Sequence, residues 1–370
     1  MRIACVIASL GSGGAERVMA SLCTAWAARG DEVSLFTFDD GRQDFHAVPA
    51  GVSRVALDLA GTSTSALGAI RANAVRLRTL RRALRRAAPD VIVSFTDRTN
   101  VSTLLAASGL GIPVVVSERI DPRRHDIGAA WSALRRLSYR WASGLVVQTA
   151  RVRAWAETHV PPTKVHVIGN PVREVATPPL AAGARATTIA AVGRLVPQKG
   201  FDTLLRAFAL VHVTHPEWRL VISGEGPQRA ALEAQRHALG LDAAVALPGR
   251  TADVDAVLAG SAVFVLSSRY EGFPNVLLEA MASGCACVAT DCDSGPSELL
   301  EHDRLGLLVP VDDAAALAAA MTRVLDDATY RTRLGDAARV STQRFAPARV
   351  LQAWDDVLTA AQRCANGRAA

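Results

Sequence analysis

Short apolar runs alternate with longer segments of helical periodicity along most of the chain. The first run covers residues 2–10 and leads into a glycine-rich loop, a helical pattern over residues 15–29 and a second apolar run over residues 32–38. Apolar runs of this kind are typical of strands buried on both faces of a parallel sheet. The repeated alternation therefore predicts an α/β fold with doubly wound parallel sheets.

The strand, glycine loop and helix pattern starts twice, once at residue 2 and again at residue 188, which predicts two domains. We expect a first domain over residues 1–171, a linker over residues 172–185 and a second domain over residues 186–344. The linker is indicated by prolines, a glycine and several alanines with no apolar periodicity. A chain of 370 residues is long enough to bury two separate cores.

The charge of the chain is unevenly distributed. Lys and Arg number 41 against 35 Asp and Glu, and residues 1–175 hold 23 of these cations but only 14 of the acids. The excess in the first half indicates an anionic partner there, such as a membrane surface, a phosphate or a nucleic acid.

Much of this excess falls in one stretch, residues 66–88, which has an apolar stripe at helical spacing. Seven arginines and no acid lie between Arg71 and Arg86, and four of them fall along one edge of the stripe: Arg71, Arg78, Arg82 and Arg85. Two interpretations stay open, a solvated face of a packed helix or a basic helix that contacts anionic lipid or a diphosphate.

The six cysteines form no C-x-x-C motif and no paired histidines accompany them, so we predict no metal site and reduced thiols in a cytosolic protein. The Asp291-x-Asp293 pair superficially matches a metal-binding D-x-D, an interpretation that we reject. The apolar stretch over residues 101–116 is broken by two glycines and a proline, and is too short to span a bilayer.

The stretch Arg269–Gly284, with the sequence RYEGFPNVLLEAMASG, follows a buried strand over residues 262–266. Pro274 suits the first turn of a helix, because its missing N–H would have no partner there. Glu271 is then expected on the loop and Glu279 just over one turn into the helix. The amino end of that helix suits a diphosphate, and the carboxylates suit sugar hydroxyls.

These residues resemble the retaining glycosyltransferases of family 4, in which two glutamates are separated by seven residues inside a motif like EGFPNVLLEAMASG. The segment GRLVPQKGFDTLL, residues 193–205, resembles the diphosphate loop of the same family. The resemblance implies the GT-B fold, two Rossmann-like domains facing across a cleft, with a helix at about residues 345–370 packing back on the first domain. It also implies a metal-independent enzyme without a cofactor, the nucleotide sugar being a substrate.

The resemblance assigns roles to individual residues. Arg194 and Lys199 would hold the departing diphosphate, and Glu271 would hold and orient the sugar, which makes these three the catalytic set. The donor would further be bound by the following residues: Gly13, Gly14, Gly224, Gly249, Arg250, Phe273, Pro274, Asn275 and Glu279. No carboxylate is assigned as a nucleophile, since the resemblance implies a same-face substitution assisted by the leaving phosphate.

The acceptor side is indicated by SFTDRTN and VVVSER, which resemble segments of the subgroup that elongates polyprenyl-diphosphate-linked saccharides. Asp97, Asn100 and Arg119 are its candidate residues, together with the arginines of the basic helix. Many relatives place a histidine where Arg119 stands, and we interpret the nearby His125 as an ordinary loop residue. The resemblance thus implies a protein at the inner face of the cytoplasmic membrane, in peripheral contact with anionic lipid.

The expected function is transfer of a hexose or N-acetylhexosamine from a UDP-sugar, with retention, to a lipid-linked saccharide in polysaccharide or glycan biosynthesis. GDP-mannose is the alternative donor. A dinucleotide-dependent oxidoreductase using the first glycine loop, with Asp39 or Asp40 on the ribose, is an alternative from another class. A nucleic-acid binder is disfavoured, because aromatic residues are few and no stacking motif is visible.

Overall fold

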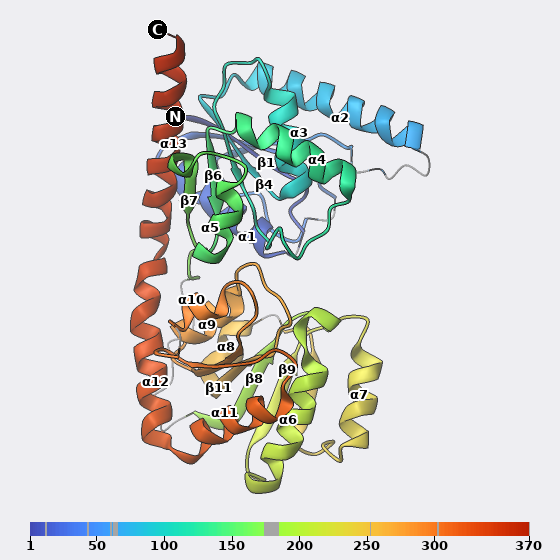
Figure 1. Ribbon diagram of the computed structural model, residues 1–370, viewed down its shortest axis with the longest axis vertical. Coiled ribbons are helices and arrows are strands. Elements are labelled where there is room, and N and C mark those ends of the chain that lie inside the picture. Colours follow the sequence, from blue (N-terminus) through green and yellow to red (C-terminus); the bar gives the residue numbers. More distant parts are fainter. Residues whose placement is uncertain are drawn as a thin grey trace. The chain divides into compact units, whose positions relative to one another are not determined.

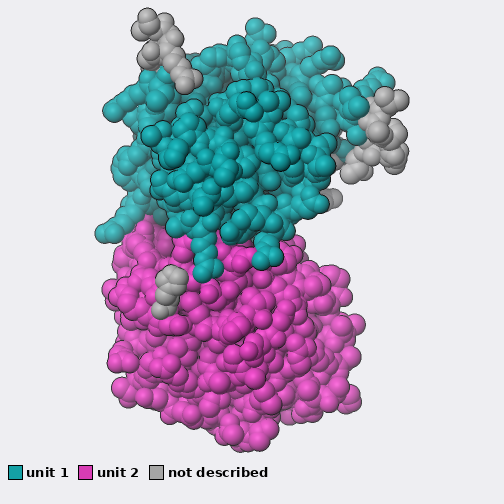
Figure 2. Space-filling model, viewed as in Figure 1, with its two compact units in different colours: residues 1–170, 348–370 teal, residues 171–347 magenta. Residues whose placement is uncertain are grey.

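The computed structural model describes residues 1–369, apart from residues 12, 43, 60, 62–65, 174–184, 252 and 302. The chain divides into two compact units: unit 1 comprises residues 1–170 and 348–370, and unit 2 comprises residues 171–347 (Figure 2). Most of the predicted linker lies outside the described residues.

Unit 1 is built on a seven-stranded parallel sheet with the order β3-β2-β1-β4-β5-β6-β7 (Figure 1). Its strands are β1 Arg2–Ile7, β2 Glu32–Thr37, β3 Val52–Ala56, β4 Val91–Phe95, β5 Val114–Ser117, β6 Gly144–Val147 and β7 Val165–Val167. The order reverses between β1 and β4, and at such a switch point the carboxyl ends of strands leave room for a ligand.

Helices cover both faces of this sheet. One face packs against α1 Gly14–Ala28 and α13 Pro347–Ala369, and the other against α2 Ala66–Ala87, α3 Asp97–Ala107, α4 Ala129–Ser138 and α5 Ala150–Glu157. Successive residues of β1 alternate between the two cores, since neighbouring side chains of a strand point to opposite faces. Short 3-10 turns follow at η1 Tyr139–Trp141 and η2 Pro162–Lys164.

The carboxyl-terminal helix α13 belongs to unit 1 from Ala348 onward. Its Trp354 is 1% exposed and packs on Phe95 of β4 with ring centroids 5.5 Å apart. The indole nitrogen of Trp26 donates a 3.0 Å hydrogen bond to Asp355 in the next position. These contacts explain why the last helix folds with the amino-terminal sheet although it follows unit 2 in the sequence.

Unit 2 repeats the plan with a six-stranded parallel sheet in the order β10-β9-β8-β11-β12-β13. Its strands are β8 Ala186–Val192, β9 Arg219–Ser223, β10 Val245–Gly249, β11 Ser261–Leu266, β12 Ala286–Thr290 and β13 Leu307–Val309. Its helices are α6 Phe201–Thr214, α7 Arg229–Ala238, α8 Val254–Gly260, α9 Asn275–Ala282, α10 Pro296–Leu299, α11 Ala314–Asp326 and α12 Ala328–Ser341, with turns η4 Pro197–Lys199 and η5 Thr342–Phe345.

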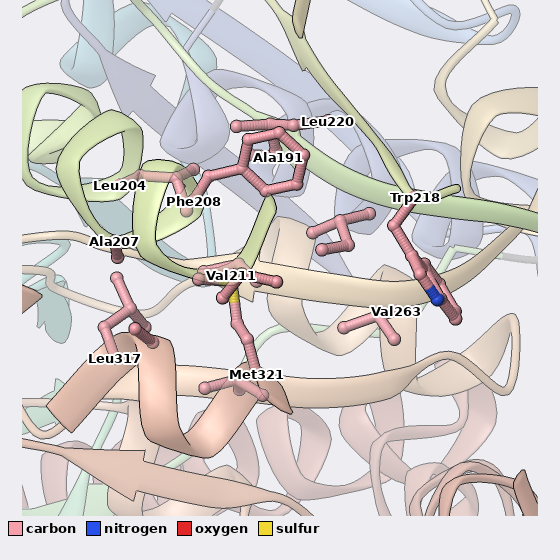
Figure 3. Close-up of a cluster of buried hydrophobic side chains, with 14 of the residues drawn as sticks. Ala191, Leu204, Ala207, Phe208, Val211, Trp218, Leu220, Val263, Leu317 and Met321 are labelled. Atoms are coloured by element: carbon pink, nitrogen blue, oxygen red, sulfur yellow. The ribbon is translucent and has the colours of Figure 1, made fainter. Parts of the chain in front are cut away.

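The unit 2 core forms where α6 and α11 meet the sheet. Phe208 of α6 lies near Leu220 of β9, while Met321 of α11 approaches Val211 from the other side (Figure 3). The opposite face is covered by α8, α9 and α10, whose apolar side chains form a second core with Phe264 and Leu266 of β11. The prediction of two doubly wound parallel α/β domains is confirmed. No helix among the described residues combines the length and the apolarity needed to cross a bilayer.

Candidate functional site

In unit 2, the loop after β8 and the loop after β11 are joined by hydrogen bonds. These two strands are neighbours in the sheet, so their carboxyl ends lie at the same edge. Ser267 Oγ donates to the carbonyl of Lys199 at 2.8 Å, and the amide of Arg269 donates to the carbonyl of Gln198 at 2.7 Å. Gln198 Nε2 in turn donates to the carbonyl of Tyr270 at 2.9 Å. Residues 198–200 and 267–270 therefore hold each other in position.

Gly200 allows the two loops to approach this closely. Its φ is +60°, and a Cβ atom added there would lie 2.1 Å from the carbonyl oxygen of Ser267. Both the backbone conformation and the lack of space require glycine at this position. Gly200 is also the residue from which α6 begins, so the same glycine ends the loop and starts the helix.

Arg269 fastens the outer side of the paired loops. Its guanidinium reaches Asp202 in the first turn of α6 at 2.8 Å and Asp312, just before α11, also at 2.8 Å. It also donates to the carbonyl of Pro197. One side chain thus connects three segments that are far apart in the sequence.

The paired loops bring Lys199 and Glu271 into contact. Lys199 Nζ lies 2.6 Å from Glu271 Oε1, and Ser268 Oγ donates to the same oxygen at 2.6 Å. Glu271 is only 7% exposed, and every contact recorded for its carboxylate among the described residues is to Oε1, none to Oε2. The stem of Lys199 crosses Gly193, where an added Cβ would lie 3.2 Å from Lys199 Cε. The site therefore presents a cation and a half-satisfied carboxylate side by side.

Arg194 lies in the loop that carries Lys199, next to Gly193. Its side chain is exposed and forms no ion pair with any residue in the described part of the chain. The structure thus brings two of the three predicted catalytic residues into contact, and Arg194 lies on the same loop without an ion pair to any described residue.

Glu279 lies on α9, where it is 7% exposed, and Glu271 lies on the loop before that helix, as the sequence pattern predicts. Phe273 packs edge-on against Phe345 at a centroid distance of 5.7 Å. The amides of Asn275 and Leu277 donate to the carbonyls of Phe273 and Pro274. Fewer first-turn amides are therefore left for an anion than the sequence suggests.

The loop over residues 291–295 supports this segment from outside. Ser294 Oγ donates to the carbonyl of Gly272 at 3.0 Å, and a Cβ on Gly295, whose φ is +100°, would lie 2.4 Å from Pro274 Cδ. Asp291 and Asp293 belong to this loop. Within the described residues, no group of three or more His, Cys, Asp or Glu side chains could hold a metal ion.

The ends of β8, β9 and β10 are joined through three glycines. Gly193 N donates to the carbonyl of Ser223 at 3.0 Å, and Gly224 N donates to the carbonyl of Gly249 at 2.8 Å. A Cβ on Gly224 would lie 1.8 Å from the carbonyl oxygen of Gly193. Gly224 and Gly249 therefore set the backbone beside the Lys199 loop, and Arg250 follows them with an exposed side chain.

In unit 1, Arg119 stands at the carboxyl end of β5. Its guanidinium donates to Ser117 Oγ at 3.3 Å and to Asn170 Oδ1, and lies 4.2 Å from the ring centre of Phe95. Its Nε is buried and has no hydrogen-bond partner among the residues that the structure describes. Burial lowers the pKa of Arg119 to about 9, and only the more distant Glu16 opposes this. No carboxylate of the described chain lies within ion-pair distance of it.

Asp97 and Asn100 occupy different positions near this edge. Asp97 accepts a hydrogen bond from His125 Nδ1 at 2.8 Å, which fixes the position of this loop histidine. The two residues are 28 positions apart, and no spacing in the sequence indicates that they pair. Asn100 is fully buried and donates to the carbonyl of Ser117 at 2.9 Å and to Tyr139 at 3.2 Å. Asn100 is thus placed to hold β5 in position.

Glu118 is a buried acid that the sequence does not single out. Tyr139 donates to its Oε1 at 2.5 Å and Arg135 lies 3.6 Å away, while Oε2 is buried and no described residue hydrogen-bonds to it. Burial raises the pKa of Glu118 to about 7, and the Tyr139 hydrogen bond opposes that rise.

The first glycine loop ends at Gly13, which precedes α1 with a φ of −83°, and Gly14 is the first, exposed residue of the helix. A Cβ on Gly13 would lie 2.1 Å from Glu16 Oε2, which belongs to a side chain that can move. Space at this loop is therefore restricted mainly by Glu16.

The four arginines predicted along one edge of α2, at positions 71, 78, 82 and 85, are exposed and form no ion pair or hydrogen bond with the rest of the described chain. Arg81, by contrast, donates to the carbonyl of Ala106 at 2.8 Å. Leu80 and Leu84 are buried against the sheet, whereas Ile70 is 67% exposed. The helix thus packs through its second half and presents a cationic face to solvent.

Two family models match this chain. Residues 13–171 match the model described as "Glycosyl transferase 4-like domain", and residues 173–341 match the model described as "Glycosyl transferases group 1". Together they cover most of both units.

Individual proteins resemble the chain over different lengths. One relative, from Campylobacter jejuni, is 29% identical over 96% of this chain and 97% of its own length. It is named as an alpha-1,4-N-acetyl-D-galactosaminyltransferase acting on a GalNAc-GalNAc-diNAcBac-PP-undecaprenol. An exopolysaccharide phosphotransferase of Streptomyces coelicolor is 31% identical over 76% of this chain, which spans only 29% of that protein. Anabaena HepE, crystallised with UDP, superposes with a TM-score of 0.80 at 21% identity, covering 97% of this chain and 100% of HepE.

Proposed function

The chain belongs to the glycosyltransferases, with a glycosyl transferase 4-like domain followed by a group 1 domain, and on that premise we propose that it uses a UDP-sugar as donor. It transfers a hexose or an N-acetylhexosamine, with retention at the anomeric carbon, to a polyprenyl-diphosphate-linked saccharide. The name of the Campylobacter relative supports the lipid-linked acceptor, and the UDP bound to HepE supports the donor.

The contact between Lys199 Nζ and Glu271 Oε1, at 2.6 Å, carries this proposal. A nucleotide sugar joins a dianionic diphosphate to a hydroxyl-rich ring through one oxygen atom. A site for it needs a cation for the phosphate and a hydrogen-bond acceptor for the hydroxyls close to each other. The ion pair supplies both groups, and Glu271 Oε2 has capacity for a sugar hydroxyl.

Charge develops on the diphosphate as the glycosidic bond breaks. Lys199 stabilises that charge as a point cation and Arg194 as a planar fork, which removes the need for a metal ion. Glu279 accepts from the ribose hydroxyls. Glu271 orients the sugar through Oε2, while Lys199 and Ser268 hold its Oε1, and the proposal assigns no carboxylate as a nucleophile.

The acceptor side rests on Arg119. Burying a guanidinium without a carboxylate is costly, and the cost is relieved when an anion binds. The cluster of Arg119, Ser117 and Asn170 holds this cation at the carboxyl edge of β5. A phosphate of the lipid-linked acceptor fits that requirement.

Peripheral membrane contact is the further part of the proposal. The exposed arginines of α2 carry no counter-charge on their helix, and anionic headgroups attract such residues with about 1 kcal/mol each. When α2 contacts the inner face of the cytoplasmic membrane, unit 1 lies beside the lipid-linked acceptor held in that membrane.

The donor can be tested before the acceptor is known. Purified protein is incubated with UDP-glucose, UDP-galactose, their N-acetylated forms and GDP-mannose, and nucleotide release by slow hydrolysis is measured. We expect one UDP-sugar to be hydrolysed, and Glu271→Ala to abolish its hydrolysis while the protein stays folded. Hydrolysis of GDP-mannose alone would replace the donor with its alternative. Wild-type rates in the Glu271 variant would refute the role of the ion pair.

A further inference from the structure

Two large apolar side chains are exposed on the segment formed by α4 and η1. Leu137 and Trp141 are each 46% exposed, and they lie four positions apart, so they occupy the same side of the helical segment. Ala133, a further turn back, is exposed as well. These side chains form a short apolar ridge on the surface of unit 1.

The rotation of the segment is fixed by its buried face, so the exposure of the ridge is built into the fold. Tyr139 is fully buried and donates to Glu118, and Arg135 is buried beside the same carboxylate at 3.6 Å. Arg135 also lies over the ring of Trp155 at 5.0 Å. With these two side chains held inside, Leu137 and Trp141 are directed outward.

The ridge lies within a cationic setting. Arg136 and Arg140 are exposed beside it and form no ion pair with any described residue. No Asp or Glu occurs from Ala129 to Ala142. The indole of Trp141, which has one polar end on an apolar body, is suited to the boundary between headgroups and acyl chains.

The cationic face of α2 belongs to the same layer of unit 1. Helices α2, α3 and α4 all cover one face of the sheet, with α3 packed between the other two (Figure 1). The outer surfaces of helices in one layer face away from the sheet, so the exposed arginines of α2 and the ridge are on the same side of the unit. A planar partner with an anionic surface and an apolar interior matches both the exposed arginines and the apolar ridge.

We propose that Leu137 and Trp141 insert into the interface of an anionic lipid bilayer, while Arg136, Arg140 and the exposed arginines of α2 bind the headgroups. Electrostatic attraction brings unit 1 to the surface, and insertion of the ridge retains it there at salt concentrations that screen the arginines. The inference extends the membrane contact of the proposed function, but no sugar substrate is needed to test it.

The test measures co-sedimentation with vesicles of phosphatidylcholine, with and without phosphatidylglycerol, at low and high salt. We expect Leu137→Ser/Trp141→Ser to weaken binding to the anionic vesicles by about tenfold or more, with the larger fractional loss at high salt. Arg136→Gln/Arg140→Gln should weaken binding mainly at low salt. The matched control is Leu210→Ser/Val213→Ser on α6, which removes apolar side chains that are 55% and 82% exposed in unit 2.

A second readout reports insertion directly. Trp131 and Trp155 are half-buried, so both are first replaced by phenylalanine, which leaves Trp141 as the one exposed tryptophan beside the buried Trp26, Trp218 and Trp354. Brominated acyl chains should quench part of the fluorescence of this variant, and a further Trp141→Phe should remove most of that quenching. Donor hydrolysis by the serine variant should equal that of the wild type, which separates this inference from the proposed function. Unchanged vesicle binding by the serine variant overturns the proposal. So does loss of a dimer in lipid-free sedimentation, which would identify the ridge as an interface between copies.

Discussion

Replacing Lys199 by methionine removes the cation of the candidate donor site while keeping the length of the side chain. Lys199 and Glu271 are both largely buried, at 15% and 8% side-chain exposure, and their atoms are 2.6 Å apart. In this setting a preorganised cation stabilises developing charge by about 3 kcal/mol, which corresponds to a loss of about 10² to 10³ in kcat. We expect that loss, together with weaker binding of the donor.

The same variant leaves Glu271 without its cation, so a structural effect has to be separated from a catalytic one. Breaking a mostly buried pair destabilises the fold by about 3 kcal/mol, and a double-mutant cycle with Glu271→Gln should show a coupling of about 1 to 2 kcal/mol in the free energy of unfolding. The double variant should recover stability without recovering turnover, because catalysis needs both groups.

The assay measures nucleotide release from the preferred UDP-sugar over a range of donor concentrations, alongside urea unfolding. Arg236→Met is the control, since Arg236 pairs with Asp242 on the surface of the same unit, outside the paired loops. If Lys199→Met retains the wild-type kcat and KM while losing stability, the lysine is structural. The diphosphate then has to be bound elsewhere.

Three further predictions concern the scaffold. Gly224→Ala should destabilise unit 2 and slow donor turnover, because its Cβ would lie 1.8 Å from the carbonyl oxygen of Gly193; an unchanged urea midpoint would contradict the close approach. Trp354→Ala should lower the free energy of unfolding by about 3 to 5 kcal/mol through loss of packing on Phe95, seen as an earlier urea transition. Glu118→Gln should abolish a pH dependence of the free energy of unfolding, measured by urea denaturation at a series of pH values. The folded wild type holds this proton up to a pKa of about 7 against 4.5 when unfolded, so wild-type stability should fall by about 3 kcal/mol as the pH rises through that interval, and the variant should lack this loss.

Local pattern in the sequence determined much of this protein. The buried strands, the glycine loops at their ends and the positions of Glu271 on a loop and Glu279 on a helix all follow from apolar periodicity and turn residues. Periodicity reports which face of each element is buried, because burial repeats with the period of the helix or the strand. The doubly wound class of both sheets could therefore be predicted without coordinates.

The partners of the polar side chains were decided by the tertiary structure. Lys199 meets Glu271 because β8 and β11, which are not consecutive in the sequence, lie side by side in the sheet. His125 reaches Asp97 across a loop, and no acid of the described chain pairs with Arg119, although Glu118 is its neighbour in the sequence.

The ridge on α4 and η1 gives the clearest contrast. Composition alone would place Leu137 and Trp141 inside and Arg135 outside, yet the buried Glu118 holds Arg135 and Tyr139 in the interior and turns the apolar pair to the surface. A sequence fixes the chemistry of each position, whereas strand order and helix rotation fix which chemistries meet. Pairings over long sequence separations depend on strand order and helix rotation, and they leave no periodic signal in the sequence.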